Sequence, residues 1–267
     1  IFELKEVIKK YAKPRKTEIV YSTEIEETTV EEEIPDYPVN LFFTKEGYFK
    51  KITPLSLRMS ATHKLKEGDE IVQTFETTNA KELLFFTNKQ QVYKTNAAFF
   101  EDTKASVLGD FVAAKLEMDE GEAPIYMAVT SDYKGYMMFF FENGKVAKVD
   151  LSAYQTVTKR KKLIKAYSDK SPLADIVHLP EDREMVVISS AGRHLLVNTA
   201  VILPKTTKDT IGVSVMTLKK GQRIISARDY REGEFAKPYR YKAKNLPAAG
   251  ALLSADDEPE KISLFNE

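Results

Sequence analysis

The pattern of apolar residues changes once, close to the start of the chain. Apolar side chains recur at near-helical spacing in residues 1–13, at Phe2, Leu4, Val7, Ile8 and Tyr11. This spacing is typical of one face of an α-helix, and Pro14 predicts its end. From about residue 18 to residue 230, short β-branched and aromatic runs alternate with turn-forming residues. The pattern predicts an all-β domain preceded by one short helix.

One ten-residue segment occurs four times, each time as an apolar strand, a polar turn and a second strand. The copies are FFTKEGYFKK (42–51), FFTNKQQVYK (85–94), FFFENGKVAK (139–148) and VISSAGRHLL (187–196). Glycine occupies the turn in three copies, at Gly47, Gly144 and Gly192. Tight hairpin turns often need a positive φ, which glycine adopts without strain. Gln90 replaces glycine in the second copy, so that hairpin must use another turn or carry strain.

A second segment alternates with the first and begins with a small residue, usually followed by Asp and an apolar strand. Its copies are KEGDEIVQTF (66–75), VLGDFVAAKL (107–116), PLADIVHLPE (172–181) and KKGQRIISAR (219–228). Two motifs that alternate four times, about 50 residues apart, predict a propeller-like radial array of four-stranded blades. We expect four blades, or five if a degenerate blade lies in residues 97–135. A β-sandwich with coincidental internal similarity is the alternative.

The composition after residue 231 differs from that of the repeats. Residues 232–267 contain Pro238, Pro247 and an acidic end, and predict a partly flexible C-terminal tail with a short docked piece such as Ile262–Phe265. We therefore expect a helix and linker in residues 1–17, the β domain in 18–231 and the tail in 232–267. The chain begins at Ile1 rather than Met, so we expect a segment of a longer protein.

Candidate catalytic chemistry is sparse. Cysteine is absent, which excludes disulfides and cysteine–metal sites and fits a reducing cytosol. His63, His178 and His194 occupy unrelated repeat positions, and no phosphate loop, dinucleotide fingerprint or metal-binding motif occurs. No apolar run approaches the roughly 18 residues of a membrane helix. We predict no catalytic residue, no metal site and no membrane association, and we expect the phenylalanines of the hairpins to form the core between blades.

Charge is balanced in total but segregated along the chain. Lys and Arg number 40, as do Asp and Glu. Residues 17–37 carry only acidic charges, whereas residues 200–244 carry eleven Lys or Arg against four acids. Because equivalent positions of successive blades lie around one rim, cations that end the hairpins would form a curved track there. Such a track would contact phosphates without reading base sequence, would bind more weakly as salt rises, and would favour bent DNA.

The predicted DNA-binding residues are the cations of the hairpin ends, of the segment after the third hairpin and of the later repeats. They are Lys50, Lys51, Arg58, Lys64, Lys94, Lys145, Lys148, Lys159, Arg160, Lys161, Lys162, Lys165, Lys205, Lys208, Lys219 and Lys220.

Three stretches carry a family resemblance. They are LLFFTNKQQVYK (83–94), PRKTEIV (14–20) and DTIGVSVMTLKKGQRII (209–225). Together with the alternating repeats, they resemble the C-terminal β-pinwheel domains of the A subunits of DNA gyrase and topoisomerase IV, the bacterial type IIA topoisomerases. The resemblance covers about residues 1–230.

The resemblance implies a non-catalytic domain that binds and bends double-stranded DNA and presents it for strand passage. The parent would be a cytoplasmic, nucleoid-associated type II DNA topoisomerase, an isomerase that changes DNA topology. It would contain an A-subunit dimer and an ATPase B subunit, and would use ATP and magnesium, whereas this segment would need no cofactor. The family's catalytic tyrosine lies in the preceding core, so no tyrosine of this chain takes that role. The family's strand-swapped closure also implies that residues 24–34 pair near the last repeat.

Two departures from the family pattern stand out. Gyrase carries a glutamine–arginine–arginine–glycine-rich box after its first hairpin, and the corresponding residues 53–69 here offer only Arg58, His63, Lys64 and Lys66. This difference favours a topoisomerase IV-like relative over gyrase. Four hairpins are also fewer than the five or six blades usual in the family.

Two other functions compete with DNA binding. A propeller-like protein-interaction module without direct DNA binding would fit the neutral net charge. A hydrolase propeller with a central site would require a convergent set of acid–base or metal-binding residues, which the sequence lacks.

Overall fold

The chain is described by a computed structural model, which places residues 2–11, 34–59, 62–156 and 161–257. It divides into two units, Ile1–Glu33 and Ile34–Glu267. In the first unit, the predicted short helix is confirmed as α1 (Phe2–Tyr11), and none of its residues is buried.

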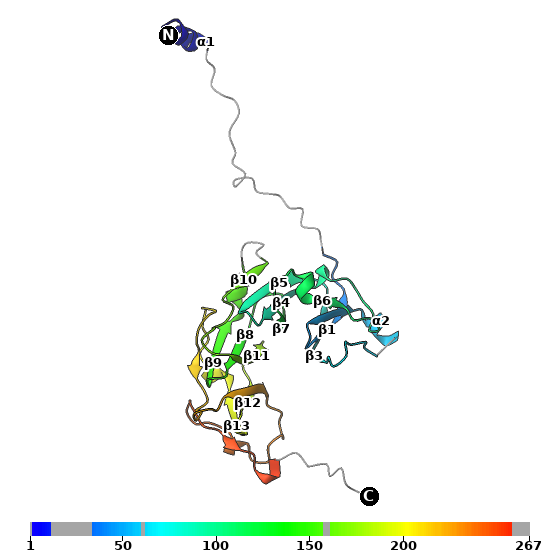
Figure 1. The fold of residues 1–267 in the computed structure, drawn as a ribbon, viewed down its shortest axis with the longest axis vertical. Coiled ribbons are helices and arrows are strands. Elements are labelled where there is room, and N and C mark those ends of the chain that lie inside the picture. The colour runs from blue at the N-terminus through cyan, green and yellow to red at the C-terminus, as the bar shows by residue number, and fades with distance from the viewer. Residues whose placement is uncertain (1, 12–33, 60–61, 157–160, 258–267) are drawn as a thin grey trace. The chain divides into compact units, whose positions relative to one another are not determined.

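The second unit consists of four antiparallel sheets of four strands each, which we call blades 1 to 4 (Figure 1). Blade 1 has the order β3 (Ile71–Thr78), β1 (Pro38–Thr44), β2 (Tyr48–Ile52), β6 (Asp110–Phe111). Blade 2 has the order β7 (Pro124–Thr130), β4 (Glu82–Thr87), β5 (Gln91–Asn96), β10 (Lys162–Ile164). Blade 3 has the order β11 (Leu173–Leu179), β8 (Tyr136–Phe141), β9 (Lys145–Asp150), β14 (Val213–Ser214). Blade 4 has the order β15 (Ile224–Asp229), β12 (Glu184–Ser189), β13 (Arg193–Asn198), β16 (Ala251–Leu252).

Short helices follow or separate these strands. They are α2 (Pro54–Met59), η1 (Ala97–Phe99), α3 (Val112–Lys115), η2 (Leu151–Tyr154), η3 (Thr199–Val201), η4 (Pro238–Arg240) and η5 (Ala255–Asp257). The all-β, propeller-like prediction with four blades is therefore confirmed. Residues 97–135, considered above for a fifth blade, instead supply β6 and β7 to blades 1 and 2.

The fourth strand of each blade comes from a distant part of the chain. In blade 1, β6 follows the β4–β5 hairpin of blade 2; in blade 2, β10 follows the β8–β9 hairpin of blade 3. In blade 3, β14 follows the β12–β13 hairpin of blade 4. After each of the first three hairpins, the chain thus builds part of the next blade before it returns. Blades 1 to 3 are consequently each completed by a segment that follows the hairpin of the next blade, whereas β16 of blade 4 comes from the chain after the last repeat.

All four copies of the first repeat form the predicted hairpins, β1–β2, β4–β5, β8–β9 and β12–β13. Gly47, Gly144 and Gly192 take φ values of 84°, 86° and 70° in the turns. Gln90 adopts the same left-handed region at φ 53°, so the second hairpin keeps the turn and carries the strain. The third strands β3, β11 and β15 coincide with the second repeat.

The prediction that each copy of the second repeat forms a turn and the strand after it, as a third strand of its blade, was wrong for the copy at 107–116. There, Gly109 and Asp110 lead into β6 and then α3, and the third strand of blade 2 is β7. Gly109 lies so close to β2 that an added Cβ would stand 2.3 Å from the Phe49 carbonyl oxygen. Gly109 and Asp110 therefore allow a fourth strand, β6, to pack closely against β2. They resemble the turn before a third strand only in sequence.

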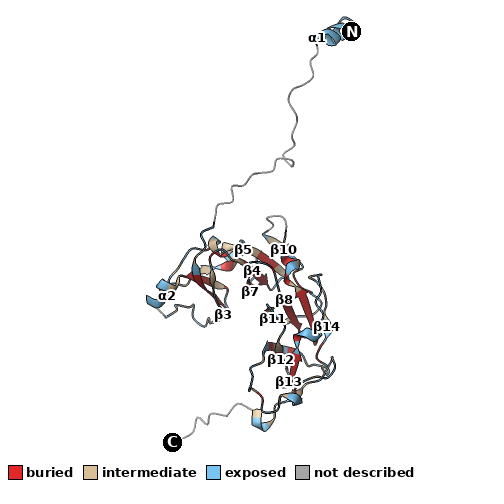
Figure 2. Cartoon of the chain, turned by 180° about the vertical axis from the view of Figure 1, so that it is seen from behind, coloured by how far each residue is buried: buried red, intermediate tan, exposed pale blue. Residues whose placement is uncertain are grey.

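The core lies between successive blades. Phe43 of blade 1 packs in one cluster with Phe85 and Met127 of blade 2. Phe86 shares the next cluster with Phe139 of blade 3, and Phe140 shares a third with Val187 of blade 4. The hairpin phenylalanines are therefore core residues, as predicted, and buried strands run through all four sheets (Figure 2). Within the described ranges, no hydrophobic cluster joins blade 4 to blade 1.

The segment after residue 231 packs against blade 4 as far as Asp257. Phe235 and Tyr241 are buried on Val186 and Leu196. The Tyr241 hydroxyl donates to Asp257 Oδ2 at 2.6 Å, and β16 pairs with β13. The docked piece expected at Ile262–Phe265 lies outside the described residues. So does the strand expected at 24–34, except for Ile34, which is not in a strand.

Candidate nucleic-acid interface

The lysines that end the hairpins are mostly inside the fold. Lys51 is 2% exposed, and its Nζ lies 2.6 Å from Asn79 Oδ1 and 3.2 Å from Asp102 Oδ1. The same ammonium lies 5.8 Å from the centroid of the Tyr37 ring. Its positive charge is therefore balanced by an acid, an amide and an aromatic face within the protein.

Lys148 has the equivalent place in blade 3 and an equivalent environment. Its Nζ donates to Asp182 Oδ1 at 2.5 Å and to the Thr199 carbonyl oxygen at 3.2 Å, 4.2 Å from the Tyr136 ring centroid. Burial would raise the pKa of Asp182, but the hydrogen bonds from Lys148 and Thr199 prevail and hold that pKa below its ordinary value. Lys148 thus stabilises the fold from a position that is 2% exposed.

Lys50 and Lys94 are also engaged internally. Lys50 is fully buried and donates to the carbonyl oxygens of Lys64 and Ala105 at 2.6 and 3.1 Å. Lys94 is half-buried; its Nζ donates to Thr156 Oγ1 at 3.0 Å and lies 5.1 Å from the Tyr133 ring centroid. Desolvation lowers the pKa of both ammonium groups. The predicted track of hairpin-end lysines is therefore wrong for Lys50, Lys51 and Lys148, because other segments cover the ends of the second strands.

The covering segments are the connections that lead to the fourth strands. Backbone hydrogen bonds dock each connection beside a second strand: Thr103 N to Lys51 O at 2.7 Å, Lys94 N to Lys161 O at 2.7 Å, Lys205 N to Lys148 O at 2.8 Å and Leu196 N to Tyr241 O at 2.9 Å. The four connections therefore occupy corresponding places in successive blades. Two of the strands that they feed, β10 and β14, lie on the outer side of the curve formed by the blades (Figures 1 and 2).

Each connection exposes a lysine next to its docking point. These residues, which we call the connection lysines, are Lys104, Lys161, Lys205 and Lys242. Lys242 forms an ion pair with Glu184 at 2.7 Å. Among the residues that the structure describes, no ion pair engages the other three. Lys161 and Lys205 are among the DNA-binding residues predicted from the sequence and stay a prediction; Lys104 and Lys242 are not among them, because only the docking of the connections relates the four.

The other predicted cations are scattered over the surface. Arg58, Lys64, Lys165, Lys219 and Lys220 are exposed, and Lys145 and Lys208 are half-buried. The Nζ of Lys208 lies 6.0 Å from the Tyr154 ring centroid. Lys159 and Arg160 lie outside the described residues. Exposed lysines in corresponding places thus follow the connections rather than the hairpin ends.

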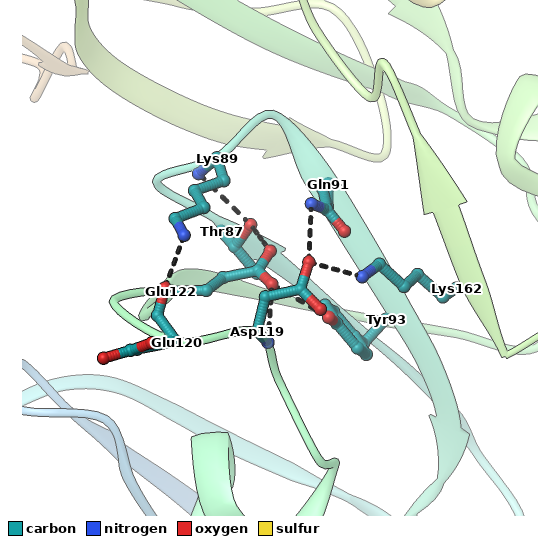
Figure 3. Close-up of polar contacts among 8 residues, drawn as sticks. All are labelled: Thr87, Lys89, Gln91, Tyr93, Asp119, Glu120, Glu122 and Lys162. Atoms are coloured by element: carbon teal, nitrogen blue, oxygen red, sulfur yellow. Dashed lines mark hydrogen bonds and ion pairs between the residues drawn. The ribbon is translucent and has the colours of Figure 1, made fainter.

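Lys162 is held by an acidic loop of blade 2 (Figure 3). Its Nζ lies 2.7 Å from Asp119 Oδ2, which also accepts from Gln91 Nε2 at 3.3 Å. The hydrogen bond from Lys162 is the main cause that lowers the pKa of Asp119. Glu122 lies beneath this pair, 5% exposed, and accepts hydrogen bonds from Thr87 Oγ1 and from the Tyr93 hydroxyl at 2.8 Å. Lys162 consequently links β10 to the rest of blade 2.

In the described part of the chain, no three His, Cys, Asp or Glu side chains gather where they could hold a metal ion. No helix in those same ranges is long and apolar enough to cross a membrane.

The sheets define the structural class. Four four-stranded blades, the first three completed by a strand from beyond the next blade, form a β-pinwheel, a propeller-like array with exchanged outer strands.

Comparison with known proteins agrees with this class. Residues 184–229, which include β12, β13 and β15, match the family described as "DNA gyrase C-terminal domain, beta-propeller". The chain is 20% identical over 235 residues to the A subunit of DNA gyrase from Borreliella burgdorferi, with 85% of the chain and 29% of that relative covered. It is 26% identical over 239 residues to the A subunit of DNA topoisomerase 4 from Staphylococcus aureus, with 87% of the chain and 30% of that relative covered.

The fold also matches a crystal structure of the C-terminal domain of DNA topoisomerase IV. The TM-score is 0.70 at 22% sequence identity, over 82% of this chain and 73% of that one. The resemblance to the C-terminal domains of gyrase and topoisomerase IV A subunits is thereby confirmed. The chain spans only 29% and 30% of the length of the two relatives above.

Proposed function

We propose that residues 34–257 bind duplex DNA without reading its sequence, bend it along the connections, and present it for strand passage by a type II topoisomerase. One observation carries the proposal: successive connections dock at corresponding places and each exposes a lysine. Lysines repeated along a curve suit a phosphate backbone better than a small ligand, because phosphates recur at regular intervals.

The relatives support the same role and suggest its setting. Both relatives described above are A subunits of DNA topoisomerases. We infer a parent enzyme with an A-subunit dimer and an ATPase partner that uses ATP and magnesium in the cytoplasm, with no cofactor bound by this domain. Residues 53–69 contain no glycine-rich centre. Arg58, in α2, and Lys64 are both exposed. This supports a topoisomerase IV-like duty over gyrase-type wrapping.

The decisive experiment measures binding of the chain to random duplex DNA at several salt concentrations. Each lysine that contacts one phosphate contributes about 0.9 to the slope of log affinity against log salt. The triple variant Lys104→Gln/Lys161→Gln/Lys205→Gln should therefore bind DNA more weakly, and the magnitude of its salt slope should be smaller by about 3.

A matched variant removes the same charge elsewhere. Lys45, Lys66 and Lys134 are exposed and each pairs with an acid, so Lys45→Gln/Lys66→Gln/Lys134→Gln should change the slope little. Equal losses in the two variants would exclude the connections as the binding surface. If the unaltered chain did not bind DNA even at low salt, a protein-interaction module would become the better assignment.

A further inference from the structure

A cavity of about 340 Å³ lies beside the β4–β5 turn of blade 2. Lys89, Gln90 and Gln91 line it from that turn, and Ile164 and Lys165 line it from the end of β10. Residues 167–170 and the approach to β14 complete its wall. We call it the seam cavity, because it joins blade 2 to the connection that serves blade 3.

The side chains that line the seam cavity carry one positive charge in excess. Three cations, Lys89, Lys165 and Lys170, face two acids, Asp169 and Asp209. Lys170 already pairs with Asp169 at 3.6 Å. Lys89 donates to the Glu120 carbonyl oxygen at 2.5 Å, which leaves two of its three N–H groups available. The excess matches the single negative charge of a phosphodiester.

The backbone around the seam cavity is unusual. Gln90 and Lys165 both lie in the left-handed region, at φ 53° and 54°, although neither is glycine. Ala166 N donates to Gln90 O at 2.7 Å, so the two strained segments hold each other. The other three hairpins have glycine where blade 2 has Gln90. A side chain in this region costs about 1–2 kcal/mol, and such strain tends to gather at functional sites.

Tyr167 lies on the floor of the seam cavity. The Tyr167 hydroxyl donates to the Thr87 carbonyl oxygen at 2.7 Å. Burial raises the pKa of Tyr167 to about 12, and the nearby Glu122 carboxylate contributes to the rise. Tyr167 is therefore uncharged near neutral pH and does not repel an anion. The buried Ser168 Oγ accepts a hydrogen bond from Lys170 N at 3.3 Å, and its hydroxyl proton remains able to donate.

We propose that the seam cavity is a binding site for one phosphate group, with Lys165 and Lys89 as its cations. The inference rests on the proposed function where the phosphate belongs to duplex DNA. Inorganic phosphate offers the same oxygens, so the experiment uses both sources.

The first arm titrates the isotope-labelled full chain with inorganic phosphate and follows backbone amide signals by NMR. Signals of residues 89–91 and 165–170 should shift together and saturate. Lys165→Asn removes the charge but suits the backbone, because asparagine tolerates the left-handed region. The shifts should be lost in this variant while its other signals stay in place. No shift at these residues in the unaltered chain would overturn the proposal.

The second arm compares DNA binding by Lys165→Asn with that of a matched variant. Lys45→Asn also removes one exposed lysine from a hairpin-turn region and introduces the residue that blade 2 has at that point, Asn88. Lys165→Asn should lower the salt slope by about 0.9, and Lys45→Asn should not. Equal salt slopes for Lys165→Asn and Lys45→Asn would show that the seam cavity does not bind a DNA phosphate, and would overturn that part of the proposal. Phosphate shifts without DNA binding by any variant would refute the proposed function and leave a site for free phosphate.

Discussion

Lys148 and Lys205 are neighbours with opposite environments. The Lys205 amide donates to the Lys148 carbonyl oxygen at 2.8 Å, so the two backbones touch. Lys148, on the second strand of a hairpin, is 2% exposed and held by Asp182. Lys205, on the connection that covers that strand, is exposed. The hairpins therefore use lysine to hold the blade together, whereas the connections present lysine to solvent.

The comparison explains why a repeated cation is a poor guide to binding. Positions that recur in a repeat are those that the fold itself requires. Lys51 and Lys148 illustrate this, because each contacts an aspartate and a tyrosine ring of its own. A long phosphate backbone instead needs charge on the outermost segment. The predictions below test whether burial or charge alone separates the two groups.

The largest effect is expected for Lys148→Met. This change leaves the Asp182 carboxylate without its cation and removes one of the two donors to the Thr199 carbonyl oxygen, the other being Ile202 N. Breaking a buried ion pair on one side costs about 3–5 kcal/mol, and the lower end applies because Asp182 keeps 32% of its side chain exposed. We expect the free energy of unfolding in urea to fall by about 3 kcal/mol. Lys205→Met should change it by less than about 0.5 kcal/mol, and similar losses in both variants would refute the distinction.

A pH series separates the charge from the packing of Lys148. The pKa of Asp182 lies below its ordinary 3.8 in the folded chain. The stability contributed by this carboxylate is fully present above the unfolded pKa and is lost as pH falls through the folded one. The stability gap between the unaltered chain and Lys148→Met should thus be constant near neutral pH and narrow below pH 3.8. A gap that persists in acid would assign the whole effect to packing.

A single connection lysine should affect binding and not folding. Lys205→Gln should lower the salt slope of DNA binding by about 0.9 and leave the urea midpoint unchanged. The slope from a salt series is the measurement. A shifted midpoint with an unchanged slope would place Lys205 with the structural lysines.

The smallest effect is expected for the exposed pair of Lys162 and Asp119. Asp119→Asn should lower the unfolding free energy far less than Lys148→Met does, because the Asp119 side chain is 51% exposed and solvent screens the pair. Urea unfolding in low and moderate salt would measure the loss, which should shrink as salt rises. A loss as large as that of Lys148→Met would show that pairing, rather than burial, makes a lysine structural.

Much of the fold could be predicted from local patterns. A hairpin is specified by a turn and two flanking apolar runs, so all four were found, and even the anomaly at Gln90 pointed to a strained turn. The fourth strands could not be predicted in this way. β6, β14 and β16 have two residues each, and they pair with partners about 60 residues away, without a local signal.

The candidate site was predicted less well, for a related reason. Lys51 is buried because Asp102 and Thr103 pass over it, and this contact joins residues about 50 apart. The copy at 107–116 was wrong because Gly109–Asp110 looks like Gly68–Asp69 in sequence while serving another strand. Sequence periodicity reveals the unit that repeats but not what covers it.

Because the outer strands are exchanged, the segment that repeats in the sequence does not coincide with a four-stranded sheet of the fold. One period of the chain, from a hairpin to the next, never holds a whole sheet. The first holds three strands of blade 1, and the second and third each hold three strands of one blade and the outer strand of the blade before it. Gain or loss of one complete period would nevertheless leave every sheet with four strands, since each period accepts and supplies an equivalent strand. Arrays of different blade number could therefore arise by simple tandem duplication, and only the last blade would need a special terminus, as β16 provides here.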